Sequence, residues 1–421
     1  MRVFACLASV CALAAATATA QPARDAWLIS AEKIYTAPDL KPLANGTVLV
    51  RSGKIAGVGD ERSRIAIPEG TRTSECRGVV VAGFQNSHVH LMGPGFDASA
   101  GKTAAELGSA LDSMLTRYGV TTIFDTGSDL ANTVAIRSRI EAGEVRGPRI
   151  LTAGWPIYPT DGIPFYLNDL PKTVLDQLKQ PRDAAAARAG VADNFAGGAD
   201  GTKLFMVTSP GQNVVRTLAP DIARAAVNAT HARGKLVLAH PTSIAGIRLA
   251  LDAGVDVVVH TTLGESAPWD AKLTGEMIAK EMSVIPTLKL WSYELAKQSV
   301  PQPVVDRLVA ATLAELRAFA DAGGQILFGT DVGYMHEFDP TDEYVLMAKA
   351  GLTPAQILAS LTTAPAKRWK EDKRRGRVEP GFDADLVVLG GDPFDDVKNF
   401  SQVRCVFRAG EQIYPAPAPA P

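Results

Sequence analysis

The chain has 421 residues, of which 46% are hydrophobic, and a formal net charge of −2. This is enough apolar material for a large core and a smaller second domain. The near-neutral charge and an aromatic content of only 6% exclude the basic, base-stacking surface that a binder of nucleic acid or of anionic membranes needs. We therefore expect a small-molecule partner.

The first twenty residues have the order of a secretory signal peptide. Met1 and Arg2 precede an apolar run over 3–16, and small residues over 17–20 precede Gln21. No later stretch of the sequence is long and apolar enough to span a membrane. We expect an exported protein, periplasmic or secreted, that is free of the membrane once residues 1–20 are removed.

Export determines which cysteines remain in the mature chain. Cys6 and Cys11 leave with the signal peptide, whereas Cys76 and Cys405 remain in a compartment that permits disulfides. Two interpretations stay open. The cysteines either form a bridge that ties the two flanks of the chain together, or they are two separate buried thiols.

The two flanks of the chain have the same all-β character. Residues 21–81 contain short strand patterns joined by turns, and similar patterns return over 377–414. We expect these two segments to build one small composite β-sandwich. The alternating Pro and Ala residues over 415–421 predict a low-complexity end without a catalytic role.

Between the flanks, residues 82–376 alternate short β-branched runs with longer helical patterns, which is typical of βα units and a parallel sheet. Eight units over about 250 residues predict an α/β fold of the (β/α)8 TIM-barrel type. An open doubly wound sheet is disfavoured, because its nucleotide-binding forms carry a glycine-rich phosphate loop that this sequence lacks. The predicted strand cores are 79–81 leading into 88–90, 121–125, 149–153, 203–207, 236–239, 255–259, 284–288 and 326–328, and the clearest helices are 104–118, 221–233, 244–253 and 303–322.

Four of the six histidines follow predicted strands: His88, His90, His240 and His260. In a barrel, this edge of the strands carries the chemistry. Residues i and i+2 of an extended segment share a face, so His88 and His90 can bind one ion together. By itself, however, His-x-His is a weak signal, and such a pair is more often a packing or surface feature.

Two charged residues strengthen the metal hypothesis. Lys203 opens an otherwise apolar run and Asp331 ends another. A lone buried charge is costly, but divalent cations among these residues would offset that cost. An ammonium group would be repelled by two cations, whereas a lysine carbamate could bridge them. The alternative is a solvated lysine head in the barrel mouth.

The order His-x-His, Lys, His, His, Asp resembles the amidohydrolase superfamily. The local sequences at 83–90, 201–203, 238–240, 255–260, 328–331 and 380–387 are similar as well, and the resemblance covers nearly the whole mature chain. It is strongest for the branch of imidazolonepropionase-like enzymes and Xaa-Pro dipeptidases. One departure is Asn86, where many relatives carry an acid, and this affects the surroundings of the metal site rather than ligation.

The resemblance implies a site with two divalent metal ions, for which we expect zinc. One ion would be held by His88, His90 and Asp331, and the other by His240 and His260. Lys203, carboxylated to N6-carboxylysine, would bridge the two. A mononuclear imidazolonepropionase-like cyclic amidohydrolase, without the carbamate, is the alternative.

The expected reaction is hydrolysis of an amide C–N bond in a dipeptide or an N-acyl amino acid. Metal ions would activate the attacking water, and Asp331 would shuttle its proton to the leaving amine. A non-catalytic barrel that binds or assembles is a second alternative, which the intact ligand set disfavours. The oligomeric state stays open, a homo-oligomer included.

Several residues in the predicted loops after strands 3, 7 and 8 are candidates for contact with the substrate. Lys289 is a conceivable clamp for a substrate carboxylate, with solvation at a strand end as the alternative. His336 follows Asp331 in a loop, and a solvated histidine is equally consistent with its position. For each aromatic residue the alternative is loop packing. The candidates are Tyr158, Tyr166, Lys289, Trp291, Tyr293, Tyr334 and His336.

Overall fold

The computed structural model describes residues 26–60, 62–63, 65–211, 213–265 and 268–416. The predicted signal peptide over 1–20 lies outside these residues, as does the end of the Pro/Ala tail from 417 onward. Within the described part of the chain, no helix is long and apolar enough to cross a membrane.

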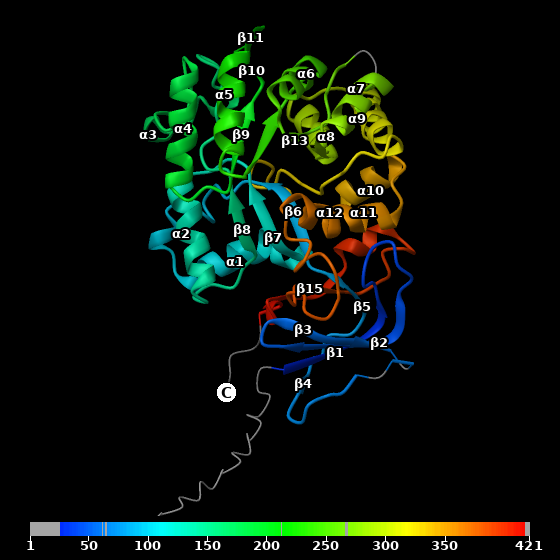
Figure 1. Ribbon diagram of the computed structural model, residues 1–421. Coiled ribbons are helices and arrows are strands. Elements are labelled where there is room, and N and C mark those ends of the chain that lie inside the picture. The colour runs from blue at the N-terminus through cyan, green and yellow to red at the C-terminus, as the bar shows by residue number, and fades with distance from the viewer. Residues whose placement is uncertain (1–25, 61, 64, 212, 266–267, 417–421) are drawn as a thin grey trace, which may run out of the picture.

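The two flanks of the chain share one eight-stranded sheet at one end of the molecule (Figure 1). Val80 of the N-terminal flank pairs with Val388 of the C-terminal flank in antiparallel register. Pairing runs without a break in the order β17-β16-β15-β5-β1-β2-β3, with β4 beside β1, so the expected composite unit takes the form of one continuous sheet. Its strands are β1 (Ala26–Ile34), β2 (Leu43–Arg51), β3 (Lys54–Gly59), β4 (Arg72–Thr73), β5 (Val79–Ala82), β15 (Leu386–Leu389), β16 (Val403–Arg408) and β17 (Glu411–Tyr414).

The segment 79–81 belongs to this flanking sheet, in agreement with the predicted flank over 21–81. The prediction that it also leads into the first barrel strand is wrong. The first strand of the central domain is β6 (Phe84–Val89). Gly83 separates the two strands, and a Cβ at this position would lie 2.3 Å from Thr121 Oγ1. The apolar run conceals the change of sheet, because both sheets bury this segment on both faces.

The central domain is a TIM-barrel-like α/β arrangement of parallel strands surrounded by helices (Figure 1). One parallel sheet has the order β6-β7-β8 and the other β14-β13-β12-β9. Isolated parallel bridges link them, namely Ile157↔Leu204 on one side, and Val284↔Ile326 and Val89↔Val332 on the other. The remaining strands are β7 (Val120–Asp125), β8 (Arg149–Thr152), β9 (Gly201–Phe205), β12 (Leu236–His240), β13 (Val257–Val259) and β14 (Ser283–Ile285).

The predicted eighth strand, 326–328, makes only isolated bridges in the structure. The predicted seventh strand also ends early, because β14 stops at Ile285 and a helix begins at Leu288. Thr287, with φ of 45°, turns the chain between them. The carboxylate that accepts hydrogen bonds from the first amides of this helix comes from Glu343, 55 residues further along the chain. Local sequence cannot reveal such a cap.

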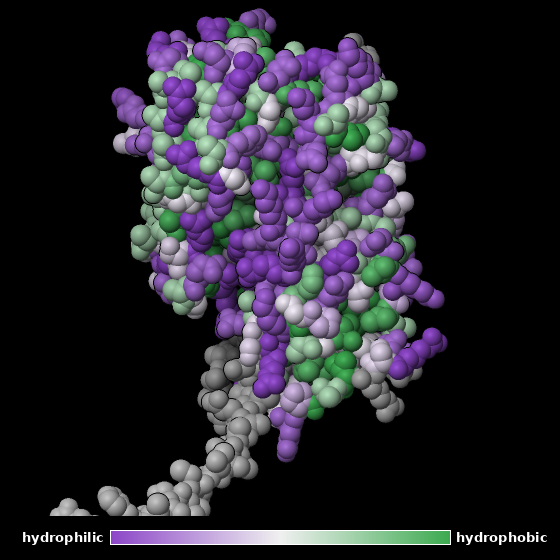
Figure 2. All heavy atoms as spheres, viewed as in Figure 1, coloured by the Kyte–Doolittle hydropathy of each residue, from purple (hydrophilic) through white to green (hydrophobic). Residues whose placement is uncertain are grey.

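Local capping explains where several predicted helices begin. Thr103 and Glu106 form a capping box at the start of α1, and the Ser243 side chain caps α6. In Figure 2, hydrophilic residues cover most of the visible face of the helical layer, which agrees with helices that turn their apolar sides inward.

The remaining elements are one hairpin, twelve helices and four short 3-10 turns in the described part of the chain. The hairpin β10 (Val207–Gly211) and β11 (Val214–Thr217) follows β9. The helices are α1 (Ala104–Met114), α2 (Leu130–Glu141), α3 (Lys172–Leu175), α4 (Ala184–Ala196), α5 (Pro220–His231), α6 (Ile244–Ala253), α7 (Ala271–Ala279), α8 (Leu288–Lys297), α9 (Gln302–Asp321), α10 (Thr341–Lys349), α11 (Pro354–Leu361) and α12 (Thr363–Arg368). The 3-10 turns are η1 (Ser99–Gly101), η2 (Thr116–Tyr118), η3 (Phe165–Leu167) and η4 (Val397–Ser401).

A disulfide joins Cys76 and Cys405, whose Cα atoms are 6.2 Å apart and which are separated by 329 residues in the sequence. Of the two interpretations left open by the sequence, the structure therefore contains the bridge. It fastens the N-terminal flank to β16 within the shared sheet.

Candidate active site

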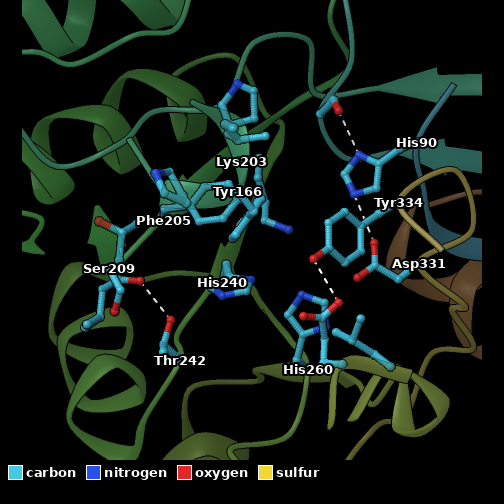
Figure 3. A pocket seen from close by; sticks show the side chains of 18 of the residues that line it. His90, Tyr166, Lys203, Phe205, Ser209, His240, Thr242, His260, Asp331 and Tyr334 are labelled. Atoms are coloured by element: carbon cyan, nitrogen blue, oxygen red, sulfur yellow. Dashed lines mark hydrogen bonds and ion pairs between the residues drawn. The ribbon is translucent and has the colours of Figure 1, made fainter. Parts of the chain in front are cut away.

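A cavity of about 390 Å³ lies at the carboxyl ends of the parallel strands (Figure 3). The strands β6, β9 and β12 supply side chains to it, and so do the residues that follow β13 and the 326–328 segment. The structure brings together all six predicted metal-site residues at this cavity, namely His88, His90, Lys203, His240, His260 and Asp331.

The six residues lie close together around Asp331. Its Oδ1 is 3.1 Å from Nε2 of His88 and 3.1 Å from Nε2 of His90. The rings of His240 and His260 have centroids 4.7 Å apart, and those of His88 and His260 are 5.0 Å apart. One ligand atom from each of His88, His260 and Asp331 lies within 4.8 Å of the others, so these three could hold a metal ion.

Contacts at Nδ1 orient the imidazole rings of His88, His90 and His260. Nδ1 of His90 donates a hydrogen bond to the Gly127 carbonyl oxygen at 2.7 Å. Nδ1 of His88 lies 2.9 Å from Thr126 Oγ1, and Nδ1 of His260 lies 2.6 Å from Thr287 Oγ1. A hydrogen bond on one ring nitrogen, with the other left for a ligand, is the usual arrangement of metal-binding histidines.

Two of the six residues have a strained backbone. His260 has φ of 76° and Asp331 has φ of 62°, in the left-handed region that residues other than glycine rarely adopt. The backbone amide of Asp331 donates to the His88 carbonyl at 2.9 Å, and that of His260 to the Ile285 carbonyl at 2.7 Å. The surrounding strands therefore hold both residues in this conformation, a feature that gathers at functional sites.

The charge state of the cluster suits a divalent cation. Burial lowers the pKa of His88 and of His240 to about 3, and lowers the pKa of Lys203 to about 7. Burial alone would raise the pKa of Asp331, but His88 and His90 outweigh it and hold that pKa well below its usual range. Neutral imidazoles, here His88 and His240, and an ionised carboxylate are the donor forms that metal binding requires. Burial lowers the pKa of His90 as well, but Asp331 outweighs burial and raises that pKa, so His90 must lose its proton when it binds a metal.

Four of the predicted substrate contacts line the cavity: Tyr158, Tyr166, Trp291 and Tyr334. Trp291 is held in place by a hydrogen bond from its Nε1 to Thr261 Oγ1 at 2.8 Å. These residues come from loops and from α8, and they surround the six polar residues at the cavity floor.

Lys289, Tyr293 and His336 do not line the cavity, contrary to the prediction. Lys289 is buried elsewhere, with its Nζ 3.2 Å from Glu337 Oε2 and 3.1 Å from the Asp339 carbonyl oxygen. Tyr293 contacts Lys297, and His336 is exposed. For Lys289 and Tyr293 the physical reason is that 288–297 is a helix rather than a loop, so only one of its faces meets the cavity.

The facing side of α8 supplies residues that sequence reasoning missed. Helical spacing leads from Leu290 and the predicted Trp291 to Glu294 and then to Gln298, which directly follows the helix, and all four line the cavity. The residues missed are Leu290, Glu294 and Gln298. A sequence analysis that had predicted a helix here could have found these residues from their spacing. The other lining residues missed are mostly apolar side chains, which come from loops, from η3 and from the strands β9 and β10. Among them are Pro164, Phe165, Leu167, Phe205, Val207 and Leu263.

Comparison with known proteins identifies the family. The model of the Amidohydrolase family matches residues 79–413. The chain belongs to this family. As an amidohydrolase, it is a metal-binding hydrolase that acts on carbon–nitrogen bonds.

Relatives of this amidohydrolase include the ochratoxinase of Aspergillus niger, which is 22% identical over 445 residues, covering 91% of this chain and 85% of the relative. A solved Xaa-Pro dipeptidase with bound methionine has a TM-score of 0.76 at 22% identity, covering 92% of this chain and 99% of the other. A putative prolidase from Bifidobacterium longum has a TM-score of 0.75 at 25% identity, covering 93% and 95%.

Proposed function

We propose that this amidohydrolase hydrolyses amide bonds with Asp331 as the group that transfers the proton. The observation that carries the proposal is the position of Asp331, whose Oδ1 lies 3.1 Å from Nε2 of both His88 and His90 at the cavity floor. The names of the structural relatives favour a dipeptide or an N-acyl amino acid as substrate.

The residues present fit a binuclear site. His88, His90 and Asp331 would hold one ion, and His240 and His260 the other. Lys203, as N6-carboxylysine, would lie between them. When bound, divalent cations such as zinc acidify water and polarise a carbonyl oxygen. Lys203 supports this arrangement because it is 1% exposed, and the described part of the chain gives its Nζ no hydrogen bond or ion pair.

The chain's own groups supply the remaining chemistry. The low pKa of Asp331 keeps it ionised at neutral pH, so it can accept the proton of the attacking water and return it to the leaving amine. The hydrogen bonds behind His88, His90 and His260 fix the rings around this carboxylate. The apolar walls limit access of other water molecules to the reacting atoms.

The first test is hydrolysis by the zinc-reconstituted protein of Xaa-Pro dipeptides, other dipeptides, N-acyl amino acids, lactones and a phosphotriester, with products identified by mass. We expect turnover of amides, and a loss of kcat of about 10²–10⁴-fold in Asp331→Ala, the range of general acid–base catalysis. The exposed Asp342→Ala is the control and should keep its activity. Turnover confined to lactones or the phosphotriester, or near-normal amide turnover by Asp331→Ala, would contradict the proposal.

The second test concerns Lys203. Elemental analysis should find two ions per wild-type chain and at most one in Lys203→Ala, because the variant loses the bridging group. Retention of two ions by the variant would rule out the bridge. One ion per fully active wild-type chain would instead favour the mononuclear alternative.

A further inference from the structure

The walls of the cavity are aromatic on two sides. On one side, Tyr158 stacks on Phe205 with ring centroids 4.5 Å apart, and Phe205 stacks on His240 at 4.8 Å. Figure 3 shows Tyr334 on the other side, and Trp291 lines the cavity next to His260, with ring centroids 6.0 Å apart. Tyr166 also lines the cavity, with its ring centroid 5.6 Å from that of Tyr334 (Figure 3). Such faces bind flat apolar groups well.

Positive charge is confined to the cavity floor. The described residues that line the cavity include no arginine and a single lysine, Lys203, which would be carboxylated in the proposed site, so that the bound metal ions would supply the positive charge. Lys203 lies with the histidines and Asp331, where the scissile carbonyl must be placed for reaction. A carboxylate on the next carbon of a substrate would lie above this floor, among the aromatic walls. Desolvation of a carboxylate without a cationic partner is costly.

The rim carries an ion pair, with the carboxylate of Glu294 among the cavity-lining residues and the ammonium group of Lys297 behind it. Glu294 lines the cavity, and its Oε1 accepts hydrogen bonds from the Tyr334 hydroxyl at 2.9 Å and from Lys297 Nζ at 3.0 Å. The Lys297 side chain is 50% exposed and is not among the cavity-lining residues. The nearby ammonium group is therefore already paired with Glu294, and a substrate carboxylate would compete with that pair.

We propose that the substrate is an uncharged amide with an apolar group on each side of the scissile C–N bond, at least one of them aromatic. This inference rests on the proposed function and narrows it, because it excludes a free carboxylate next to the scissile bond. The cavity of about 390 Å³ is large enough for such a molecule and falls in the usual range of small-molecule sites. The experiment below decides between this substrate and the dipeptide or N-acyl amino acid that the names of the structural relatives favour.

The test compares N-(2-phenylethyl)benzamide with N-benzoylphenylalanine, which differ only in one carboxylate. With the zinc-reconstituted protein, we expect kcat/KM to be at least tenfold higher for the neutral amide. We also expect the neutral amide to bind at least tenfold more tightly to the metal-loaded Asp331→Ala protein, as measured by calorimetry.

The outcomes separate this inference from the proposed function. If the neutral amide binds more tightly but neither compound is hydrolysed, the inference stands and amide hydrolysis is contradicted. Equal or better binding or turnover of N-benzoylphenylalanine overturns the inference. Failure of both compounds to bind overturns it as well.

Substitutions at the rim give an independent readout. Glu294→Gln keeps an acceptor for the Tyr334 hydroxyl but removes the negative charge, so the ratio of the two kcat/KM values should shift toward the acid by at least threefold. The matched control Glu276→Gln removes a carboxylate from an exposed ion pair with Arg248 and should leave the ratio unchanged. An unchanged ratio in Glu294→Gln, or a selective loss of acid turnover in Lys297→Met, would overturn the inference.

Discussion

At the residue scale, the ring of His260 is positioned by Thr287, and Thr287 is in turn positioned by Glu343. Thr287 lies 2.6 Å from Nδ1 of His260 and is held at a φ of 45°. The next two amides, those of Leu288 and Lys289, donate to the two carboxylate oxygens of Glu343 at 2.9 and 2.8 Å. Glu343 is 1% exposed. It is therefore a positioning residue, which acts through Thr287.

We expect Glu343→Gln to lower kcat/KM by about 10–100-fold, the usual effect of losing an outer support of a metal ligand. The amide of glutamine can accept only one of the two hydrogen bonds, so Thr287 loses its fixed position. The same variant should bind zinc more weakly, which a competitive chelator titration measures. The exposed neighbour Glu337→Gln is the control. If zinc affinity in Glu343→Gln equals that of the wild type, Glu343 has only a structural role.

At the element scale, α9 supports the loop after β13 through one buried carboxylate. Glu315 is 1% exposed and accepts hydrogen bonds from the amide and the hydroxyl of Thr262. Trp269 donates to the same hydroxyl at 3.1 Å. Burial raises the pKa of Glu315 to about 8, although its bonds to Thr262 oppose the shift.

This pKa predicts a pH dependence of stability. Between about pH 5 and pH 8 the folded protein retains a proton that the unfolded chain has lost, so the free energy of unfolding should fall as pH rises. The slope contributed by this one group is at most about 1.4 kcal/mol per pH unit. In Glu315→Gln the fall should be shallower, measured as Tm at several pH values. Parallel Tm curves for variant and wild type would contradict the assignment, and Glu276→Gln should leave the slope unchanged.

At the scale of the whole molecule, the shared sheet closes the chain on itself. β5 and β15 pair along four residues each, and the Cys76–Cys405 disulfide spans 329 residues of sequence. A disulfide is maintained in an oxidising compartment, which supports the proposed export. The mature protein should then begin at Gln21, which N-terminal sequencing measures; a chain that still begins at Met1 would contradict export.

Removal of the bridge should affect stability and not chemistry. We expect Cys76→Ser/Cys405→Ser to lower the free energy of unfolding by about 2–5 kcal/mol, measured by denaturant titration, because the unfolded chain gains freedom. The value of kcat/KM at 25 °C should stay the same, since neither cysteine lines the cavity. An unchanged unfolding midpoint would show that strand pairing alone holds the flanks together.

The sequence alone was sufficient to locate the elements and site residues that are set by neighbouring residues in the chain. Periodicity located most strands and helices, with β7, β12 and α6 close to their predicted limits. A polar residue at the end of an apolar strand was the signal for His88, His240 and Asp331, because parallel strands end at a common edge, whereas Lys203 was marked by a charge at the start of an apolar run. The family resemblance followed from the order of these residues and is confirmed by the match over 79–413.

Tertiary structure decided everything that depends on a distant partner. The 79–82 segment joins the flanking sheet because β15 lies beside it, and α8 begins at Leu288 because Glu343 accepts its first amide hydrogen bonds. That helix turns Glu294 toward the cavity and Lys289 away from it. No sequence window contains these pairs. The charge that faces the substrate, and with it the proposed specificity, was therefore set by contacts between segments far apart in the chain.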